Sequence, residues 1–261
     1  PAIQNNPNKR KSPKNLCFFK LYPYLCSMKT LLDVHTHTIA SGHAFSSLQE
    51  MTLTAKEKGL DILGITEHGP NIPGTCDPIY FRNLHCVPRQ LYGIKLMLGA
   101  ELNILNTKGD IDLDEDYWRM LDIRIAGIHS LCWQGGSKEE NTQGVINAMR
   151  NPFVQIISHP GDGTAELDFE ELMKVSRETH TLLEINNHSM APIRHKTVAA
   201  PNNLELLELA KKYETPVIFG SDAHFSAMIA DYSNIMPLVE KAEFPRSEEH
   251  TSELQSHLMI S

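Results

Sequence analysis

A histidine-rich motif follows the first apolar run of the chain. Asp33, His35 and His37 stand at alternate positions, and His43 lies shortly beyond them. Side chains of a strand alternate between its two faces, so these first three residues are expected to point the same way. Two imidazoles on one face can hold a metal ion, and a carboxylate one step deeper can orient one of them. The motif predicts a metal site, although two surface histidines on a strand can also arise by chance.

Short apolar runs alternate with amphipathic segments through the rest of the chain. We expect further strands at 62–65, 95–99, 122–126, 154–157, 181–185 and 217–219, and helices at 47–58, 81–91, 141–149, 169–179 and 204–213. Near-continuous apolar strands separated by helices indicate a parallel sheet buried on both faces. An α/β barrel and an open doubly wound sheet both fit this pattern. In either fold, functional residues gather at the carboxyl ends of the strands.

Metal-capable residues stand at or just beyond the ends of six of these strands. The candidate ligands are His35, His37, His43, His68, Glu101, His129, His159, Asp222 and His224. Each one alone is more simply explained as a surface or hydrogen-bonded residue, but a parallel α/β fold brings all the strand ends together. One zinc ion takes about three or four protein ligands, so this set suits two or three ions that share a carboxylate. Imidazole and carboxylate without thiolate suit zinc first, with manganese or iron as alternatives.

The order and spacing of these motifs resemble those of a known family. The motifs are Asp33-x-His35-x-His37, Thr66–Glu67–His68–Gly69, Gly99–Ala100–Glu101, Gly127–Ile128–His129, Ser158–His159–Pro160 and Gly220–Ser221–Asp222–Ala223–His224. They resemble the PHP (polymerase and histidinol phosphatase) family, and their spacing is most similar to that of its YcdX-type phosphatases. The resemblance covers roughly Met28 to Arg246. It implies a distorted (β/α)7 barrel with a trinuclear metal cleft.

The resemblance also implies how the ligands divide among the ions. One ion would be held by His35, His37 and Asp222, a second by His43, His68 and His224, and a third by His129 and His159, with Glu101 bridging ions. The implied reaction is phosphoester hydrolysis by metal-activated water, in which Glu101, Asp222 and His224 carry the catalysis. No protein nucleophile is required.

Two further residues are predicted to bind substrate. Asn186 shares a strand face with Glu184, and Arg194 lies on the following loop, where its guanidinium could grip a phosphate through two hydrogen bonds. An exposed loop charge is the alternative for Arg194. Glu67 is expected to support a ligand from behind. His85, His180 and His188 are not expected to be ligands.

Composition and charge limit the kinds of substrate and partner that we expect for this protein. The net charge is −8, which disfavours an unaided grip on long nucleic acid, so we expect a small phosphorylated substrate. Five cysteines without a C-x-x-C motif indicate free thiols in a reducing compartment, hence a cytoplasmic protein. No stretch is long and apolar enough to predict a membrane span. A homo-oligomer is left open.

The two ends of the chain differ from its middle. Residues 1–27 are predicted to be an extension outside the domain, which would span 28–246. Residues 247–261 resemble a translated sequencing-adapter tail, and His250 and His257 are therefore excluded from the site.

Three alternatives to a phosphatase remain at this stage. The same ions could serve a phosphodiesterase or nuclease that acts on small nucleotides. An amidohydrolase-type enzyme would attack a carbonyl carbon instead, but its usual barrel lysine ligand is not evident at any expected strand end. The third alternative is a metal-loaded regulatory protein without catalytic activity.

Overall fold

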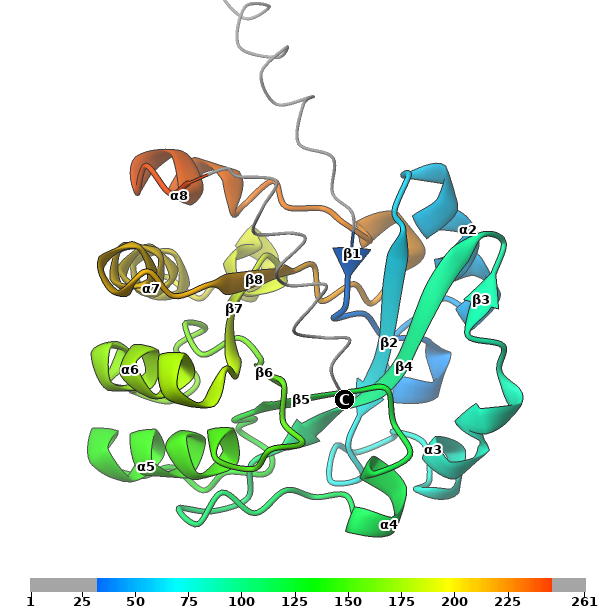
Figure 1. Cartoon of the computed structure of the whole chain (residues 1–261), viewed down its shortest axis with the longest axis horizontal. Coiled ribbons are helices and arrows are strands. Elements are labelled where there is room, and N and C mark those ends of the chain that lie inside the picture. The colour runs from blue at the N-terminus through cyan, green and yellow to red at the C-terminus, as the bar shows by residue number, and fades with distance from the viewer. Residues whose placement is uncertain (1–31, 246–261) are drawn as a thin grey trace, which may run out of the picture.

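The protein folds as a barrel of parallel strands with helices outside it, as a computed structural model shows for residues 32–245 (Figure 1). The predicted extension 1–27, the tail 247–261, His250 and His257 lie outside the described residues. The parallel strands, in their order in the sheet, are β1 (Leu32–Asp33), β2 (Ile62–His68), β4 (Ile94–Asn103), β5 (Ile123–Gly127), β6 (Ile156–Ile157), β7 (Leu182–Asn186) and β8 (Val217–Gly220). A short strand β3 (Gln90–Leu91) pairs antiparallel with β4.

The barrel closes between its first and last strands. Thr36 and Ala223 form a parallel bridge beyond the ends of β1 and β8, and the His37 N–H donates to the Ala223 carbonyl over 2.9 Å. This contact confirms the distorted (β/α)7 barrel and rules out an open sheet. It also places the first and last metal-capable motifs side by side.

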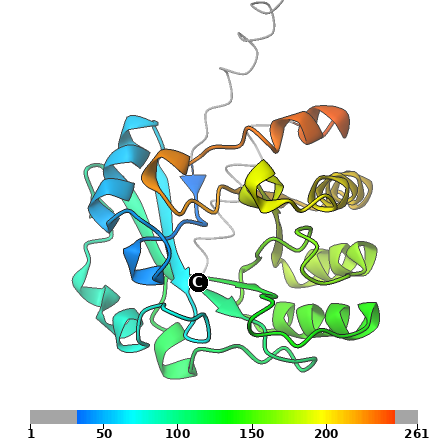
Figure 2. The ribbon, with the colours of Figure 1, turned by 180° about the vertical axis from the view of Figure 1, so that it is seen from behind.

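Helices cover the outside of the barrel. They are α2 (Leu48–Glu57), α3 (Ile79–Asn83), α4 (Glu115–Trp118), α5 (Lys138–Met149), α6 (Phe169–Thr179), α7 (Ala199–Tyr213) and α8 (Met236–Lys241). Short 3-10 turns follow several strands: η1 (Ile39–Ser41), η2 (Leu84–Cys86), η3 (His188–Met190), η4 (Pro192–Arg194) and η5 (Ser226–Met228). Seen from the front and from behind, α5 to α8 stack in one column beside the later strands (Figures 1 and 2). Every helix within 32–245 is too short or too polar to span a bilayer.

Local sequence signals set several helix starts. Ser47 and Ser137 each begin a helix with a capping box, in which the serine side chain and a glutamate three residues later satisfy each other's backbone N–H groups. Asp168 caps α6 through its carboxylate. The helices expected at 47–58, 141–149 and 169–179 are therefore found close to their predicted bounds.

The helix expected at 81–91 is wrong in its second half. The helical chain ends with η2, and residues 90–91 form strand β3 instead. Pro88 explains the break, because a proline disfavours helical geometry at the preceding residue. Val87 accordingly has extended geometry, with φ −86° and ψ 128°.

Strand alternation positions the central carboxylate. Along β4, Leu96, Leu98 and Ala100 belong to the large core cluster between the sheet and the helices, whereas Met97 belongs to a second apolar cluster, which draws residues from the other parallel strands. Glu101 lies four residues after Met97 and so shares its face. β2 extends to His68, beyond its expected end, because it pairs with β4 as far as Glu101. β4 continues to Asn103 because Leu102 and Asn103 pair with β5.

The first strand departs from the prediction at Asp33. Its buried carboxylate accepts hydrogen bonds from the Ser221 N–H (3.3 Å), the Ser221 hydroxyl (2.5 Å) and the Ala230 N–H (2.8 Å). Asp33 therefore fastens the segment after β8 to β1, and the carboxylate that contacts His35 comes from Glu184 instead. Sequence spacing alone could not distinguish these two carboxylates.

This role predicts the stability of one variant. Asp33→Ala leaves three donors without their acceptor, and a buried unsatisfied donor costs about 1–3 kcal/mol. We expect the free energy of unfolding in urea to fall by about 3 kcal/mol. Asp114→Ala is the matched control, since this exposed aspartate makes no side-chain capping bond. Equal stability of the two variants would contradict the assignment.

Candidate metal centre

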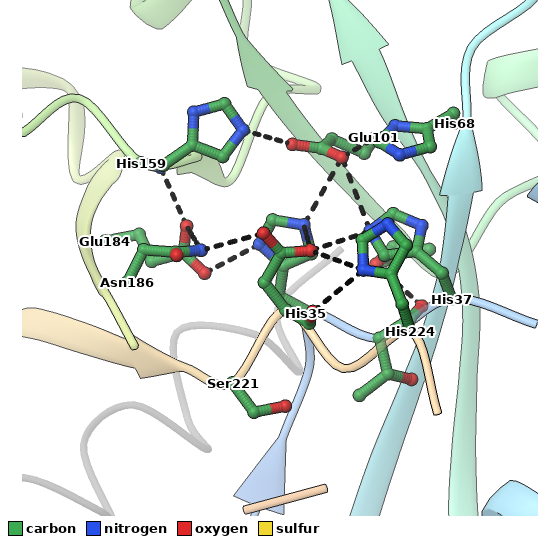
Figure 3. A network of polar contacts seen from close by, with 12 residues as sticks. His35, His37, His68, Glu101, His159, Glu184, Asn186, Ser221 and His224 are labelled. Atoms are coloured by element: carbon green, nitrogen blue, oxygen red, sulfur yellow. Dashed lines mark hydrogen bonds and ion pairs between the residues drawn. The ribbon is translucent and has the colours of Figure 1, made fainter. Parts of the chain in front are cut away.

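All nine predicted ligands gather at the carboxyl end of the barrel. His35 and His37 follow β1, His68 ends β2, Glu101 lies on β4, His129 follows β5, His159 follows β6, and Asp222 and His224 follow β8. Figure 3 shows six of these side chains converging from separate strands: His35, His37, His68, Glu101, His159 and His224. His43 reaches the same place from the loop after η1, with its ring centroid 4.8 Å from that of His68 and 5.0 Å from that of His224.

Glu101 lies at the centre of this cluster. Its Oε2 is 3.3 Å from Nε2 of His35, 3.5 Å from Nε2 of His37 and 2.9 Å from Nδ1 of His68. Its Oε1 is 3.3 Å from Nε2 of His129 and 2.8 Å from Nε2 of His159. The two oxygens of one carboxylate thus face two different groups of imidazoles, as a bridging ligand must.

Asp222 forms a second acidic point of the cluster. Its Oδ1 is 3.2 Å from Nε2 of His37 and 3.6 Å from Nε2 of His35. Burial would raise the pKa of Asp222, but His35, His37 and His224 outweigh burial and hold this pKa well below its ordinary value. Burial would also raise the pKa of Glu101, but His35, His129 and His68 outweigh burial and hold this pKa well below its ordinary value. Both carboxylates are therefore ionised and able to ligate.

Three groups of ligand atoms are compact enough to hold an ion each. They are His35, His37 and Asp222; His37, His68 and His224; and His68, Glu101 and His129, each with ligand atoms within 4.8 Å of one another. The first group equals a set implied by the family resemblance. The second group contains His37 in place of His43, which the resemblance implies. The third group contains His68 in place of His159.

Several buried ligand atoms lack a hydrogen-bond partner. They are Nε2 of His35, Nε2 of His37, Nδ1 of His68, both ring nitrogens of His129, Oε2 of Glu101 and Oδ1 of Asp222. A buried polar atom without a partner costs about 1–3 kcal/mol, so a cluster of them needs a common partner. Divalent cations supply one, and nitrogen with carboxylate oxygen fits zinc, manganese or iron. The residues present therefore fit the predicted metal ions.

Hydrogen bonds behind the cluster fix the tautomers of two ligands. Nδ1 of His35 lies 2.7 Å from Oε1 of Glu184, and Nδ1 of His224 lies 2.9 Å from the Asp222 carbonyl. A carbonyl only accepts hydrogen bonds, and the Glu184 carboxylate also accepts from the N–H groups of His159 and Asn186, so both Nδ1 atoms are assigned the proton. Nε2 of each ring is left with a lone pair to offer a metal.

Ser41 fixes the tautomer of His37 in a different way. The Ser41 hydroxyl donates its single proton to Oε2 of buried Glu67 over 2.5 Å. Its oxygen must therefore accept from Nδ1 of His37, 3.2 Å away, which again leaves Nε2 bare. The His68 N–H also donates to Ser41 Oγ over 3.1 Å. Glu67 accordingly supports ligands from behind, whereas no sequence pattern singled out Ser41 for this role.

Glu184 occupies a space that a glycine keeps open. Its Oε2 accepts from the His159 backbone N–H over 2.7 Å, while Oε1 holds His35. A Cβ at Gly220 would lie 1.7 Å from Glu184 Oε1. Gly220 thus lets β8 pass close to this carboxylate, which ties one ligand after β1 to another after β6.

The two predicted substrate residues lie in different surroundings. Asn186 is fully buried: its Nδ2 donates to Glu184 Oε2 (3.1 Å) and lies 3.4 Å from Asp222 Oδ2, and its Oδ1 accepts from Ser189. Arg194 is exposed in η4. Burial lowers the pKa of His188. The charge of Arg194 lowers this pKa further, whereas Asp222 raises it. Arg194 therefore lies within electrostatic reach of His188.

His188 contacts the cluster although it was not expected to be a ligand. Its ring stacks 5.6 Å from that of His224, at 24°, and its buried Nδ1 lacks a hydrogen-bond partner.

Lys196 and Asp162 also lie near the cluster, although no sequence pattern singled them out. They form an ion pair, and Asp162 Oδ2 lies 3.9 Å from Nδ1 of His159. His85 and His180 lie away from the cluster, in η2 and directly after α6.

Comparison with known proteins decides the family. The PHP domain matches residues 33–195, and the domain described as PHP-associated matches residues 200–244. The chain belongs to the PHP family. The resemblance inferred from the motifs is thereby confirmed, and the ligand cluster lies in the PHP barrel and its continuation.

Two bacterial relatives of this PHP chain are named "Probable phosphatase". The one from Clostridium novyi is 42% identical over 219 residues, covering 84% of this chain and 89% of the relative. The one from Caldicellulosiruptor bescii is 42% identical over 214 residues, covering 82% and 88%. The histidinol phosphate phosphatase of Lactococcus lactis, solved with zinc, L-histidinol and phosphate, shares the fold with a TM-score of 0.56 at 17% identity, covering 83% of this chain and 95% of its own.

The contact between Glu184 and His35 predicts a change in metal affinity. Glu184→Gln cannot accept from both His35 and His159 as strongly as a carboxylate does, and loss of a partner behind a ligand weakens metal affinity about 10- to 100-fold. We expect that loss in zinc competition titrations. Glu178→Gln, at an exposed position of α6, serves as the control. Unchanged zinc affinity in Glu184→Gln would contradict this role.

Proposed function

We propose that this protein is a metal-dependent phosphatase that hydrolyses phosphoesters with two or three divalent ions, zinc first. The observation that carries the proposal is the set of buried, unpartnered ligand atoms around Glu101 at the carboxyl end of the barrel. The names of the bacterial relatives support phosphatase activity. The zinc and phosphate bound to the Lactococcus lactis enzyme are consistent with the same choice of metal and substrate group.

The proposed ligand sets follow the family pattern, and the first of them is also a compact group in the structure. His35, His37 and Asp222 hold one ion, His43, His68 and His224 a second, and His129 with His159 a third, with Glu101 bridging ions. When bound, such ions acidify water and neutralise charge on phosphoryl oxygens. Glu101, Asp222 and His224 are the proposed catalytic residues.

The remaining site residues orient this machinery and the substrate. Substrate binding by Asn186 stays a prediction, and its contacts with Asp222 and Glu184 support a role as a positioning residue for these two carboxylates. Arg194, exposed and near His188, is proposed to grip the phosphoryl group. Since Glu67 and Glu184 fix the imidazoles before substrate arrives, little reorganisation is needed during the reaction.

The free thiol of Cys132 does not offer an alternative nucleophile. Cys132 follows His129 by three residues. Burial, with a smaller contribution from Asp112, raises the pKa of this thiol to about 11. The thiol is therefore protonated at neutral pH and reacts poorly. This agrees with direct attack by activated water.

The first test removes the proposed bridge. Purified wild-type protein is expected to contain two to three equivalents of zinc, manganese or iron by elemental analysis and to hydrolyse 4-nitrophenyl phosphate. Glu101→Gln removes the negative charge of the proposed bridging ligand, so we expect loss of bound metal and a fall in kcat/KM of at least about 100-fold. Glu178→Gln is the control.

The outcomes separate the proposal from its alternatives. Bound metal without turnover of any phosphomonoester would favour a regulatory protein or a carbonyl hydrolase. Turnover of bis(4-nitrophenyl) phosphate alone would favour the phosphodiesterase. A folded protein without bound metal would overturn the proposed site.

The cytoplasmic location and a homo-oligomer stay predictions.

Arg194 is tested by its effect on substrate binding. Arg194→Ala removes a charge-assisted contact to phosphate, worth about 1.5–3 kcal/mol, and should raise KM about tenfold or more while kcat changes less. Arg177→Ala, exposed on α6, is the matched control. Identical KM values in the two variants would show that Arg194 is an ordinary exposed loop charge.

A further inference from the structure

The most exposed apolar side chains gather at the end of the barrel that holds the metal centre. Six large apolar residues within 32–245 are at least 50% exposed: Ile39, Phe45, Ile79, Leu131, Ile193 and Phe225. All six lie in segments that follow the carboxyl end of a parallel strand. Isolated exposed apolar residues are normal on a protein surface, so only those that lie beside the metal ligands point to a binding surface.

The ligands show where this end opens to solvent. His37 and Glu101 have almost no exposed side-chain surface, at 0% and 1%, whereas the side chains of His129 and His224 are 15% and 18% exposed and His43 is exposed. Solvent, and therefore substrate, reaches the cluster past His43, His129 and His224.

Three of the exposed apolar residues border these same histidines. Phe45 follows His43 by two residues, Leu131 follows His129 by two, and Phe225 directly follows His224. We refer to Phe45, Leu131 and Phe225 as the apolar rim. Two hydrogen bonds join its aromatic segments: the Phe45 N–H donates to the His224 carbonyl (2.8 Å), and the Ser226 N–H donates to Ser46 Oγ (3.0 Å). Both phenylalanines are thus held beside the opening by their backbones.

We propose that the apolar rim binds the leaving group of the substrate, so that the enzyme acts on phosphomonoesters of aromatic alcohols. This inference rests on the proposed phosphatase function. A phosphoryl group that reaches the buried ligands leaves its ester oxygen directed towards the opening, where Phe45 and Phe225 lie. Aromatic rings pack against one another in offset or edge-on contacts, which an aromatic leaving group can make and a polyol cannot.

A small substrate fits the rim better than a second copy of the chain does. Each of the three rim residues follows one of the histidines His43, His129 and His224 within two positions. The apolar surface therefore borders polar ligands. A second copy seated there would bury those histidines and block their access to substrate. An aromatic ester covers the rings and still delivers its phosphoryl group to the ligands.

The test compares two phosphonates that cannot be hydrolysed. Binding of 2-naphthylmethylphosphonate and methylphosphonate to zinc-loaded protein is measured by calorimetry. The wild type should prefer the naphthyl compound by about tenfold, and Phe45→Ser and Phe225→Ser should each reduce this ratio about three- to fivefold while methylphosphonate affinity stays unchanged. Leu53→Ser is the control, since Leu53 is a 41% exposed apolar residue of α2 outside the rim.

The outcomes distinguish the rim from the reaction. A ratio near one in the wild type, or one unchanged in both phenylalanine variants, would overturn the rim even if 2-naphthyl phosphate is hydrolysed. A ratio that falls as expected without hydrolysis of any phosphomonoester would keep the rim and reject the phosphatase. Variants that change only the sedimentation of a dimer would show that the rim is an interface between two copies, and would likewise overturn the inference. Thermal melts of each variant confirm folding.

Discussion

The structure depends on one buried carboxylate that faces five imidazoles. Glu101 is removed from water by the barrel, and ligands from four other strand ends approach its two oxygens within 3.5 Å. Such a group is costly to bury alone, because a charge in a poorly hydrated interior needs a compensating charge. Bound cations would supply that compensation and would satisfy the unpartnered nitrogens around it. The barrel is thus a scaffold that concentrates ligand atoms at one end.

A second layer of carboxylates determines which nitrogen of each ring is available. Glu184 fixes His35, and Glu67 fixes His37 through Ser41. Both carboxylates are buried. Glu67 lies on β2, which pairs with β1, whereas Glu184 reaches His35 from β7, so the orientation of His35 depends on closure of the sheet. Closure in turn needs close backbone approach, which Gly220 permits beside Glu184. Fold and ligand geometry are therefore specified together.

Much of this arrangement follows from strand patterning. Because parallel strands end at one edge, apolar runs that end in histidine or acid predict a common site, and the motif order predicts its family. The supporting contacts are not predictable in this way. Asp33 and Glu184 are both acids on strand faces, and only the register of β1 against β8 shows that Asp33 binds Ser221. Asn186 and Ser41 likewise have roles that depend on partners distant in sequence.

The central claim is that metal ions occupy the space around Glu101. Anomalous diffraction from crystals grown with zinc, recorded above and below the zinc edge, tests it most directly. The account predicts two or three anomalous peaks within ligand distance of Glu101, Asp222 and the surrounding imidazoles, at about 2.0–2.2 Å from nitrogen and oxygen ligands. Zinc peaks only at surface histidines such as His85, with none beside Glu101, would contradict it.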